Sequence, residues 1–554
     1  MFFNFIKKNK LLSFLIGIGF FAYLLITFPS GSYYCFNHQC GIYFWGAHEH
    51  DAIWHLAVVE TAFSQWPPRH PVFAGATLSG YNFFLDLMIF ILAKTGIPAI
   101  IWYFKILPVI WFILYTFLSL KLAEKINKSY WFRVFFLFFN YFGASFALFF
   151  TLYHKKSIWG SSSIMASQPL LSLVNLQFAF SLIFILLTLI TFFEKNKIKK
   201  ILIYSIIIFI NLALKFYGGV VNLFLIFGLI LIEKNKLKEK LFSSFFIGAF
   251  AFISLLIFYQ PFSAAKTGLP LIFSPFAMVH NLIEEKDLFY LPSLVNARYF
   301  LYEKGLGPRL LAIEFFSSFL FLFFNFGVRF FGLLYFLIGF FYKKINRFHL
   351  IIFLTIIFSC LLTIFFIQKG IWWNTIQFTY YGLFLANIFT ALFLMEFVYQ
   401  RKIKFLILVV FLILINIPEN IDVLKGFNPL KRTGFIDKKE LETLNFLKKK
   451  EDGIIFAPSL NGDTIHKESA YVSAFTGKPT YFNDLHVLEI TGVDWRNREK
   501  EIANIDKINL EELPVRYFYL LKKDKNYPIL IQKINLMKNH KKIFDNQEVS
   551  VFEK

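Results

Sequence analysis

The sequence is poor in cysteine and in acidic residues. Of its 554 residues only 3 are cysteine, and 57 Lys and Arg outnumber 35 Asp and Glu. Cys360 lies inside an apolar run and is interpreted as a packing residue. Cys35 and Cys40 form an isolated C-x4-C pair, which is weak evidence for a metal site. In an oxidising compartment they could close a small disulfide, and two free thiols are an equally good interpretation.

A cleavable signal peptide is also missing. The first apolar run ends in Thr27-Phe28-Pro29 rather than in a small-x-small cleavage site, and further apolar runs follow it. We therefore interpret Leu11–Phe28 as a retained first helix.

Apolar residues are what the chain has in excess. They make up 57% of it, and the mean hydropathy of +0.58 is well above that of an ordinary soluble domain. Apolar runs recur from Leu11 to Ile417, many near the length that crosses about 30 Å of hydrocarbon. Beyond Asn420 they stop. We predict an α-helical polytopic membrane protein with a transmembrane domain over residues 1–417 and a small α/β domain over residues 418–554.

The net charge of +22 lies almost entirely in the apolar part. From Pro418 onward 23 Lys and Arg face 21 Asp and Glu, a balance of +2, which leaves +20 for the first 417 residues. Those cations form short clusters between apolar runs, as the positive-inside rule predicts for cytoplasmic loops. A nucleic-acid surface would need one contiguous basic face, so we expect no nucleic-acid partner. The clusters are Lys7–Lys10, Lys121–Arg133, Lys195–Lys200, Lys234–Lys240, Lys343–Arg347 and Arg401–Lys404.

Placing these clusters inside gives about 11 transmembrane helices in the cytoplasmic membrane. The N-terminus is then cytoplasmic, the C-terminal domain is extracytoplasmic, and large outer loops lie at about 30–97 and 260–309. Asp51–Gln65 and Tyr81–Ala93 are expected to lie as amphipathic helices at the outer interface. Phe132–Leu152 is expected to be a single span. Ile201–Leu214 and Gly219–Ile232, joined by Lys215–Gly218, could be a pair of thin spans or a broken pair that enters from the cytoplasmic side. Leu310–Tyr342 is interrupted at Asn325–Gly327 and is expected to be an interfacial helix followed by a crossing that ends at Lys343.

The C-terminal domain shows no chemistry of its own. It has neither a Gly-rich phosphate loop nor Ser-His-Asp spacing. Asp437-Lys438-Lys439-Glu440 resembles a capping box that opens a helix to Lys450. The other expected elements are strands at Gly453–Ala457 and Val515–Leu521, a helix at Asn526–Asn539, and a hairpin of Lys541–Phe544 with Val549–Phe552.

Polar residues gather in the first outer loop, and chemistry could lie there. The loop contains His48-Glu49-His50-Asp51, and on a helix that begins near Asp51 the side chain of His55 shares its face. A carboxylate and an imidazole at a membrane interface could remove a proton from a hydroxyl group. Carboxylates and histidines could also hold a divalent cation, although no specific ligand spacing is present. The plainer interpretation is a polar loop with an N-capping Asp51 and surface histidines.

Several segments in this order resemble the GT-C-type membrane glycosyltransferases, in particular an uncharacterised bacterial branch. In the first loop they are H-D-x-x-W-H-L-A from His50, P-P-x-H-P-x-x-A-G from Pro67 and G-Y-N-F-F-L-D from Gly80. Later ones are W-N-T-I-Q-F-T-Y-Y from Trp373, V-S-A-F-T-G-K-P from Val472 and the closing I-F-D-N-Q-E-V-S-V-F-E-K. The resemblance implies about a dozen spans, a large outer loop with an acidic residue and, often, an outer C-terminal α/β domain.

The resemblance implies transfer of a sugar from a polyprenyl phosphate to an acceptor hydroxyl of a glycan, lipid or protein. Asp51 matches the acidic residue of the first loop, which implies the general base, with Glu49, His50 and His55 beside it. The Asp-x-Asp or Asp-Glu pair of several branches is absent, since Ala52 follows Asp51, so the need for a cation stays open. Further substrate contacts are expected from His50, His70, Asn374 and Gln377.

The donor phosphate needs Arg or Lys near the outer leaflet. Lys215 is the strongest candidate because apolar residues flank it, and an ionisable residue within a span is costly unless it is used. Each candidate could equally be an interfacial cation whose side chain reaches back to water. The other candidates are Arg298, Arg69, Lys266 and Arg309.

Two other classes of function fit the composition. A transporter would show broken helices at matching positions of two halves, and only one break of this kind, at Lys215–Gly219, is found. A non-catalytic protein that binds glycolipids or takes part in envelope assembly is the closer alternative, because Asp51 has no partner that the sequence identifies.

Overall fold

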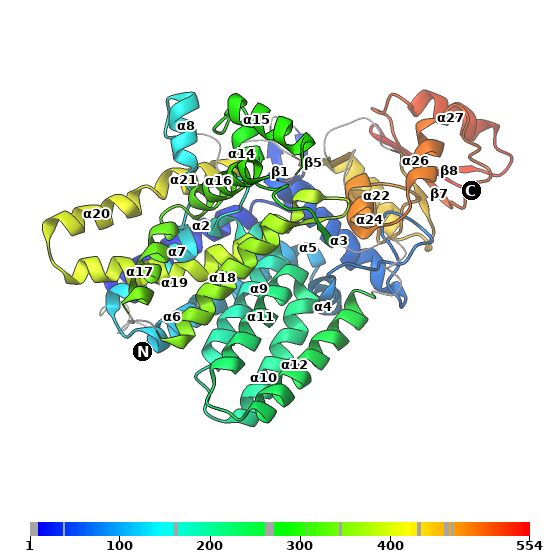
Figure 1. Ribbon diagram of the computed structural model, residues 1–554. Coiled ribbons are helices and arrows are strands. Elements are labelled where there is room, and N and C mark those ends of the chain that lie inside the picture. The colour runs from blue at the N-terminus through cyan, green and yellow to red at the C-terminus, as the bar shows by residue number, and fades with distance from the viewer. Residues whose placement is uncertain are drawn as a thin grey trace. The chain divides into compact units, whose positions relative to one another are not determined.

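The computed structural model of the chain describes most of its residues and is shown in Figure 1. It divides into two compact units, each built from separate stretches of sequence. The helical unit comprises Met1–Leu24, Ile110–Ser254 and Leu269–Lys425, and the mixed unit comprises Leu25–Val109, Leu255–Gly268 and Gly426–Lys554. The described residues are 9–36, 39–159, 164–260, 271–305, 307–342, 346–428, 434–458, 465–466 and 470–554.

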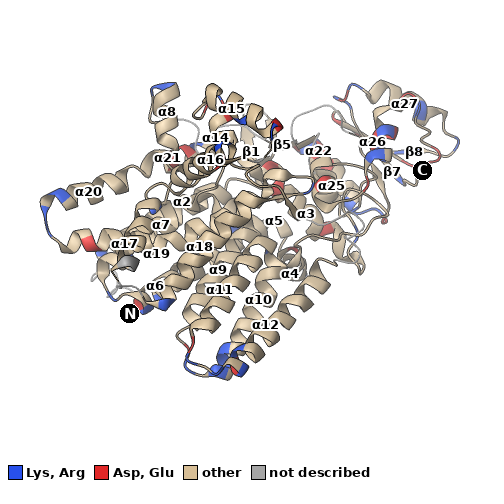
Figure 2. Cartoon of the chain, in the orientation of Figure 1, with Lys and Arg blue, Asp and Glu red and all other residues tan. Residues whose placement is uncertain are grey.

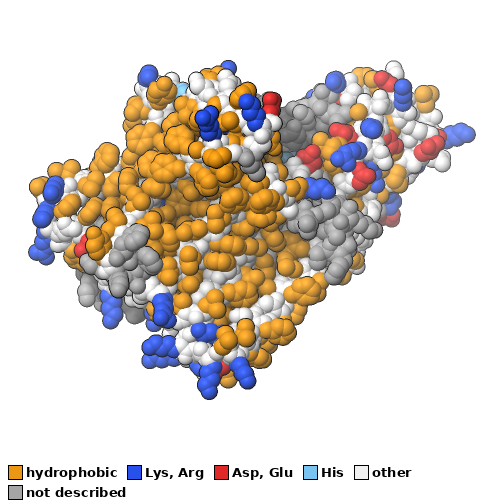
Figure 3. All heavy atoms as spheres, in the orientation of Figure 1, with side chains coloured by type: hydrophobic (Ala, Val, Ile, Leu, Met, Phe, Trp, Pro, Cys, Tyr) orange, Lys and Arg blue, Asp and Glu red, His pale blue; other side chains and the backbone are white. Residues whose placement is uncertain are grey.

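The helical unit consists almost entirely of apolar helices. Phe, Ile and Leu dominate their sequences, and in Figure 3 hydrophobic side chains cover most of the visible face of these helices. Basic side chains gather where α10 and α12 begin (Figure 2). The helices are α2 (Lys10–Thr27), α6 (Leu107–Ile126), α7 (Tyr130–Phe142), α8 (Ala147–Lys155), α9 (Leu176–Thr191), α10 (Lys197–Leu214), α11 (Phe216–Ile232), α12 (Leu237–Phe258), α14 (Asn281–Glu284), α15 (Pro292–Glu303), α16 (Pro308–Phe326), α17 (Arg329–Phe341), α18 (Arg347–Phe365), α19 (Gln377–Tyr399), α20 (Ile403–Leu414) and α21 (Ile417–Gly426).

Seven of the described helical segments are long and apolar enough to cross a membrane, or up to eight if one bent pair is a single span. An 18-residue helix such as α2 is about 27 Å long, close to the thickness of the hydrocarbon core. The prediction of a multi-pass helical membrane protein is confirmed. The count of about 11 spans stays a prediction, because α9 and α11 are apolar but shorter.

Three breaks interrupt the apolar helices. The expected interruption near Asn325 is confirmed: α16 ends at Phe326, and Gly327 adopts a φ of +56° that favours glycine. The expected break after Leu214 is also present. It is shorter than the predicted Lys215–Gly218, because only Lys215, whose backbone is extended, separates α10 from α11. The segment expected as a span over Phe132–Leu152 is bent, because α7 and α8 meet at an angle of 53°, and its crossing of the membrane as one span stays a prediction.

The mixed unit begins with a hairpin of β1 (Ser32–Phe36) and β2 (Gln39–Phe44). Cys35 lies opposite Cys40 in its register, and the two are joined by a disulfide. Strand β5 (Gly434–Asp437), from the C-terminal part of the chain, pairs antiparallel with β2. The first loop and the C-terminal segment therefore share one sheet. The first loop also contains the α-helices α3 (Asp51–Thr61), α4 (Phe84–Ala93) and α5 (Ala99–Ile101).

Helix α3 is enclosed on all sides. Of its 11 residues all but Asp51 and Glu60 are buried, because it packs against α4 and against α24 (Tyr471–Thr476) of the C-terminal segment. The expectation of an amphipathic helix at the interface is wrong for this segment. Its sequence predicted the helix, and its largely apolar character, interrupted by His55, explains the burial.

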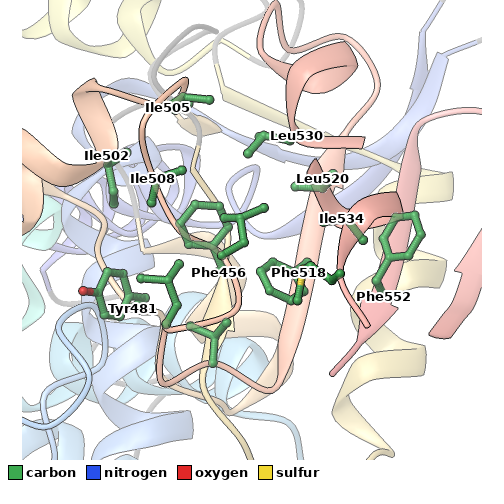
Figure 4. Packing of buried hydrophobic residues seen from close by; sticks show 14 residues of the cluster. Phe456, Tyr481, Ile502, Ile505, Ile508, Phe518, Leu520, Leu530, Ile534 and Phe552 are labelled. Carbon is green, nitrogen blue, oxygen red and sulfur yellow. The ribbon is translucent and has the colours of Figure 1, made fainter. Parts of the chain in front are cut away.

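The C-terminal segment has the expected small α/β pattern. Its four-stranded sheet has the order β6-β7-β9-β8, with β6 parallel to β7 and the β8–β9 hairpin antiparallel. Buried residues around Phe456, Phe518 and Phe552 form its core (Figure 4). The elements are β6 (Ile455–Phe456), β7 (Tyr517–Leu521), β8 (Lys541–Asp545), β9 (Val549–Glu553), α22 (Lys438–Lys448), α25 (Leu485–Thr491), α26 (Arg496–Ala503) and α27 (Tyr527–Leu536).

The capping box is present only in half. Asp437 caps α22 by accepting a hydrogen bond from the backbone N–H of Lys439 at 2.8 Å. Glu440 was expected to complete the box. Instead its carboxylate is fully buried and binds His466 Nε2 at 2.8 Å. A buried carboxylate needs a charged or hydrogen-bonding partner, and that need determines where Glu440 points.

Candidate functional site

Asp51 lies at the N-terminus of α3 with its side chain 43% exposed. The position favours an anion, because the positive end of the helix dipole lies there. The neighbouring His50 faces it, with Nδ1 3.4 Å from Asp51 Oδ1. The structure thus brings together two of the residues that the sequence indicated.

His50 is held from its other side by Asp484. Its Nε2 lies 2.9 Å from Asp484 Oδ1, and the Asp484 carboxylate is buried. Burial alone would lower the pKa of His50, but the charges and hydrogen bonds of Asp484 and Asp51 outweigh it and raise the pKa to about 10. His50 is therefore a cation at neutral pH, placed between two carboxylates.

His55, on the same helix as Asp51, faces a carboxylate of the next helix. It is buried, and its Nδ1 lies 3.1 Å from both carboxylate oxygens of Asp86 on α4. Its Nε2 is 3.5 Å from the hydroxyl of Tyr81. Burial, together with the charges of Asp86 and Asp51, raises the pKa of Tyr81 well above its usual range. The i+4 spacing correctly placed His55 on α3, but its partner comes from the next helix.

The two remaining candidates in this part of the loop lie apart from Asp51. His70 is fully buried, with Nε2 3.1 Å from the hydroxyl of Thr491, and burial lowers its pKa to about 3. It is a neutral packed ring. Glu49 ends a short 3-10 turn, Gly46–Glu49, and is partly exposed next to Gly434 of β5.

Arg69 joins the first loop to the C-terminal segment. Its guanidinium binds both oxygens of Asp452, at 2.6 and 3.3 Å, and donates to the carbonyls of Thr61 and Gly477. These contacts occupy most of its donors within the mixed unit. A donor phosphate would have to compete with them, so the contacts favour a structural role.

Lys215 lies in the helical unit among other predicted residues. It is 6% exposed, its Nζ lies 3.4 Å from Asn175 Oδ1, and it stands 6.0 Å from the ring of Tyr217. The Tyr217 hydroxyl donates to Gln368 Oε1, which also accepts from Asn374 Nδ2 at 3.0 Å. Gln377 in turn donates to Asn374. The structure thus groups Lys215, Asn374 and Gln377 through Tyr217 and Gln368, two residues that the sequence did not single out.

Arg298 is buried and already paired. Its Nε lies 2.9 Å from Glu314 Oε1, and Glu284 lies 3.8 Å from its Nη1. His280 binds the other oxygen of Glu314 at 2.6 Å. The carboxylates of Glu314 and Glu284 thus balance the positive charge of Arg298, which was expected to bind the donor phosphate. Of the other basic candidates, Arg309 is exposed in the first turn of α16, and Lys266 lies outside the described residues.

A divalent cation was the cofactor that the sequence left open. Within the residues that the structure describes, no three His, Cys, Asp or Glu side chains converge as a metal site. Around His50 the two carboxylates approach an imidazolium, which has no lone pair to offer a metal. The described part of the chain therefore assigns no set of ligands to a cation.

Comparisons with known proteins identify the fold. No protein-family model matches the chain, and no curated protein sequence matches it. Two solved structures of the Archaeoglobus fulgidus oligosaccharyltransferase do resemble it. One, tethered with an acceptor peptide containing the NVT sequon, is 13% identical with a TM-score of 0.51, covering 94% of this chain and 70% of that one. The other, in complex with Zn and sulfate, is 12% identical with a TM-score of 0.51, covering 91% and 67%.

These neighbours are archaeal, so nothing in the comparison supports the expected bacterial branch. At this level of identity the likeness concerns the fold alone, since fold and chemistry are inherited separately. The chain has a fold like that of the Archaeoglobus fulgidus oligosaccharyltransferase, and the expected GT-C superfamily and its activity stay proposals.

Proposed function

We propose that the chain transfers a sugar from a polyprenyl-phosphate donor to an acceptor hydroxyl at the outer face of the cytoplasmic membrane. The observation that carries the proposal is the half-exposed Asp51 carboxylate, fixed at a helix N-terminus beside the His50 imidazolium. A general base needs access to its substrate and a fixed position, and Asp51 has both. The likeness in fold to an oligosaccharyltransferase supports the reaction class.

In the proposed step Asp51 takes the proton of the acceptor hydroxyl. The acceptor oxygen forms a bond to the anomeric carbon of the sugar, and the bond from that carbon to the lipid phosphate oxygen breaks. The bonding electrons leave with the phosphate. We assign the donor phosphate to the basic residues that the sequence indicated. Lys215 is the first choice, because Arg298 and Arg69 are paired with carboxylates. Asn374 and Gln377 are assigned to sugar hydroxyls.

The outward orientation of the mixed unit has two supports. The Cys35–Cys40 disulfide is of the kind that persists in an oxidising compartment. The pairing of β2 with β5 requires the first loop and the C-terminal segment to lie on the same side of the membrane. We therefore propose an extracytoplasmic C-terminal segment and a cytoplasmic N-terminus, with the basic clusters inside.

The neighbouring structure that holds an acceptor peptide makes a protein acceptor one option, besides a glycan or a lipid. A non-catalytic glycolipid-binding role is the second candidate. It is favoured by the full pairing of Arg69 and Arg298, which leaves fewer cations to receive a phosphate. Both functions predict binding of the lipid-linked sugar, and only the glycosyltransferase predicts its turnover.

The test is glycosyl transfer by the purified chain in lipid, with a panel of polyprenyl-phosphate sugars. Asp51→Asn keeps the size of the side chain and removes the base, so kcat should fall by 100-fold or more, the usual contribution of a general base being about 10²–10⁴. Asp494→Asn is the matched control, an exposed carboxylate of the same unit. Donor binding should be equal in all three proteins.

Two results would change the proposal. Undiminished transfer by Asp51→Asn would keep the enzyme and remove Asp51 as its base. Donor binding without transfer by the unmodified chain, over the whole panel, would favour the glycolipid-binding role.

A further inference from the structure

Asp484 stands out because a buried carboxylate with a left-handed backbone is rare. Its side chain is 2% exposed and its φ is +52°. Asn and Asp are the residues that most readily adopt such a backbone after glycine. A local structural reason also exists: Asp484 caps α25 by accepting from the backbone N–H of Val487 at 3.2 Å.

The cap does not explain the charge. Asn and Ser cap helices as well as Asp, and Asn tolerates the left-handed conformation. A buried carboxylate is costly unless a cation meets it. The cation here is His50, 2.9 Å from Asp484 Oδ1. The second oxygen, Oδ2, is buried and makes no hydrogen bond within the described part of the chain.

The geometry around His50 determines its protonation state. Both ring nitrogens face carboxylate oxygens, Nε2 that of Asp484 and Nδ1 that of Asp51. A neutral imidazole has only one N–H donor, whereas the imidazolium has two. The cation satisfies both contacts, and the negative charge of each carboxylate stabilises it. A further titratable neighbour is His486, whose ring stands 5.2 Å from that of His50, edge to face.

We infer that Asp484 is a positioning residue that holds His50 as an imidazolium against Asp51. Asp484 binds one nitrogen, the ring becomes doubly protonated, and the second nitrogen fixes one oxygen of Asp51. The catalytic meaning rests on the proposed function, in which Asp51 is the base. The C-terminal segment thereby reaches the site through the side chain of Asp484, which lies 434 residues from His50 in the sequence.

Asp484→Asn separates the charge from the cap. Asparagine keeps the cap, the left-handed backbone and an acceptor oxygen for His50, and loses only the negative charge. In ¹⁵N-histidine-labelled protein at pH 7.5, the His50 ring should change from doubly protonated to neutral in this variant. The His50→Gln spectrum assigns the signal. A His50 that stays doubly protonated without the Asp484 charge overturns the inference.

Kinetics then test whether Asp484 acts through His50. Asp484→Asn and His50→Gln should each lower kcat about tenfold, as residues that orient a functional group do, with the donor KM unchanged. The double variant should lose no more than either single one. Losses that multiply would show that Asp484 acts independently of His50 and would refute the inference.

The control is Glu440→Gln, which removes another buried carboxylate bound to a histidine in the mixed unit, here His466. It should leave kcat unchanged, and an equal loss would assign the effect to folding and overturn the inference. A failure of the proposed function looks different: the unmodified chain then shows no transfer at all, and the histidine spectra, which need no turnover, decide the inference alone.

Discussion

Two histidines of the first loop, His50 partly buried and His70 fully buried, have pKa values shifted in opposite directions. His50 stands between two carboxylates, and its pKa is raised to about 10. His70 meets only a hydroxyl in an apolar interior, so burial lowers its pKa to about 3. Both belong to motifs that look alike in the sequence. Their charge is decided by partners in the C-terminal segment, Asp484 and Thr491.

The low pKa of His70 predicts a loss of stability in acid. Between pH 6.5 and 3 the unfolded chain binds a proton at His70 that the folded chain does not, so the contribution is complete above pH 6.5 and falls on acidification. At pH 5 the loss from this residue is about 2 kcal/mol. The measurement is the free energy of unfolding of the unmodified chain and of His70→Gln at pH 7.5 and 5.

The difference in free energy of unfolding between the unmodified chain and His70→Gln should be smaller at pH 5, because the glutamine side chain binds no proton. Stabilities that fall in parallel, with that difference unchanged, would contradict a neutral buried His70.

At the scale of elements, the bend between α7 and α8 shows how an apolar helix can be broken without a proline. Its free backbone groups need partners, because hydrocarbon offers none. Asn416 Oδ1 accepts from Ala144 N at 2.8 Å, and Glu419 Oε2 accepts from Ser145 N at 2.7 Å. Phe146 N donates to the carbonyl of Phe324 at 2.8 Å, at the end of α16. The backbone N–H groups at this bend thus find acceptors just before and within α21 and at the end of α16.

This explains which breaks the sequence could predict. The break near Gly327 and the one at Lys215 carry local signals, an Asn-Phe-Gly run and a lysine in an apolar segment. The bend after Phe142 has only Gly143, and the partners that stabilise it stand 272 and 274 residues away. The site divides in the same way: Asp51, His50 and His55 were evident locally, whereas Asp484 was not.

Gly143 should tolerate no side chain. A Cβ at this position would contact the guanidinium of Arg329 and come within 2.7 Å of the Phe139 carbonyl. Arg329 is fully buried and bound to Gln168 and Asn387, both at 2.8 Å, so it has little room to move. Gly143→Ala should therefore lower the free energy of unfolding by about 2 kcal/mol or more.

The matched control is Gly248→Ala in α12, where nothing lies within 4 Å of the added Cβ. At this position the substitution should raise the free energy of unfolding by no more than about 1 kcal/mol, because alanine favours the helix over glycine. Thermal unfolding in one detergent compares the two variants. Equal midpoints for both would mean that Arg329 is not packed against Gly143.

At the scale of the whole molecule, the chain is organised by contacts as well as by composition. Composition marks where the apolar runs end, near Asn420. Contacts group the C-terminal segment with the first loop, 400 residues earlier, in one mixed unit. The disulfide-bonded hairpin and β5 make this grouping continuous through one sheet. A domain formed in this way cannot have its first loop and its C-terminal segment on opposite sides of a membrane.

That constraint, together with the positive-inside rule, makes the topology testable. In a background that keeps only one reactive cysteine at a time, Lys449→Cys in the C-terminal segment and Lys238→Cys in a basic cluster are both exposed lysine replacements. A membrane-impermeant maleimide on sealed, right-side-out vesicles should label position 449 and not position 238. In a chain that keeps both Cys35 and Cys40, Cys35 should react from the same side as position 449, and only after reduction of the disulfide. Permeabilised vesicles should then label position 238. Labelling of Cys35 and position 449 from opposite sides would contradict the pairing of β2 with β5, whereas labelling of 238 from outside would leave the fold intact and reverse only the proposed orientation.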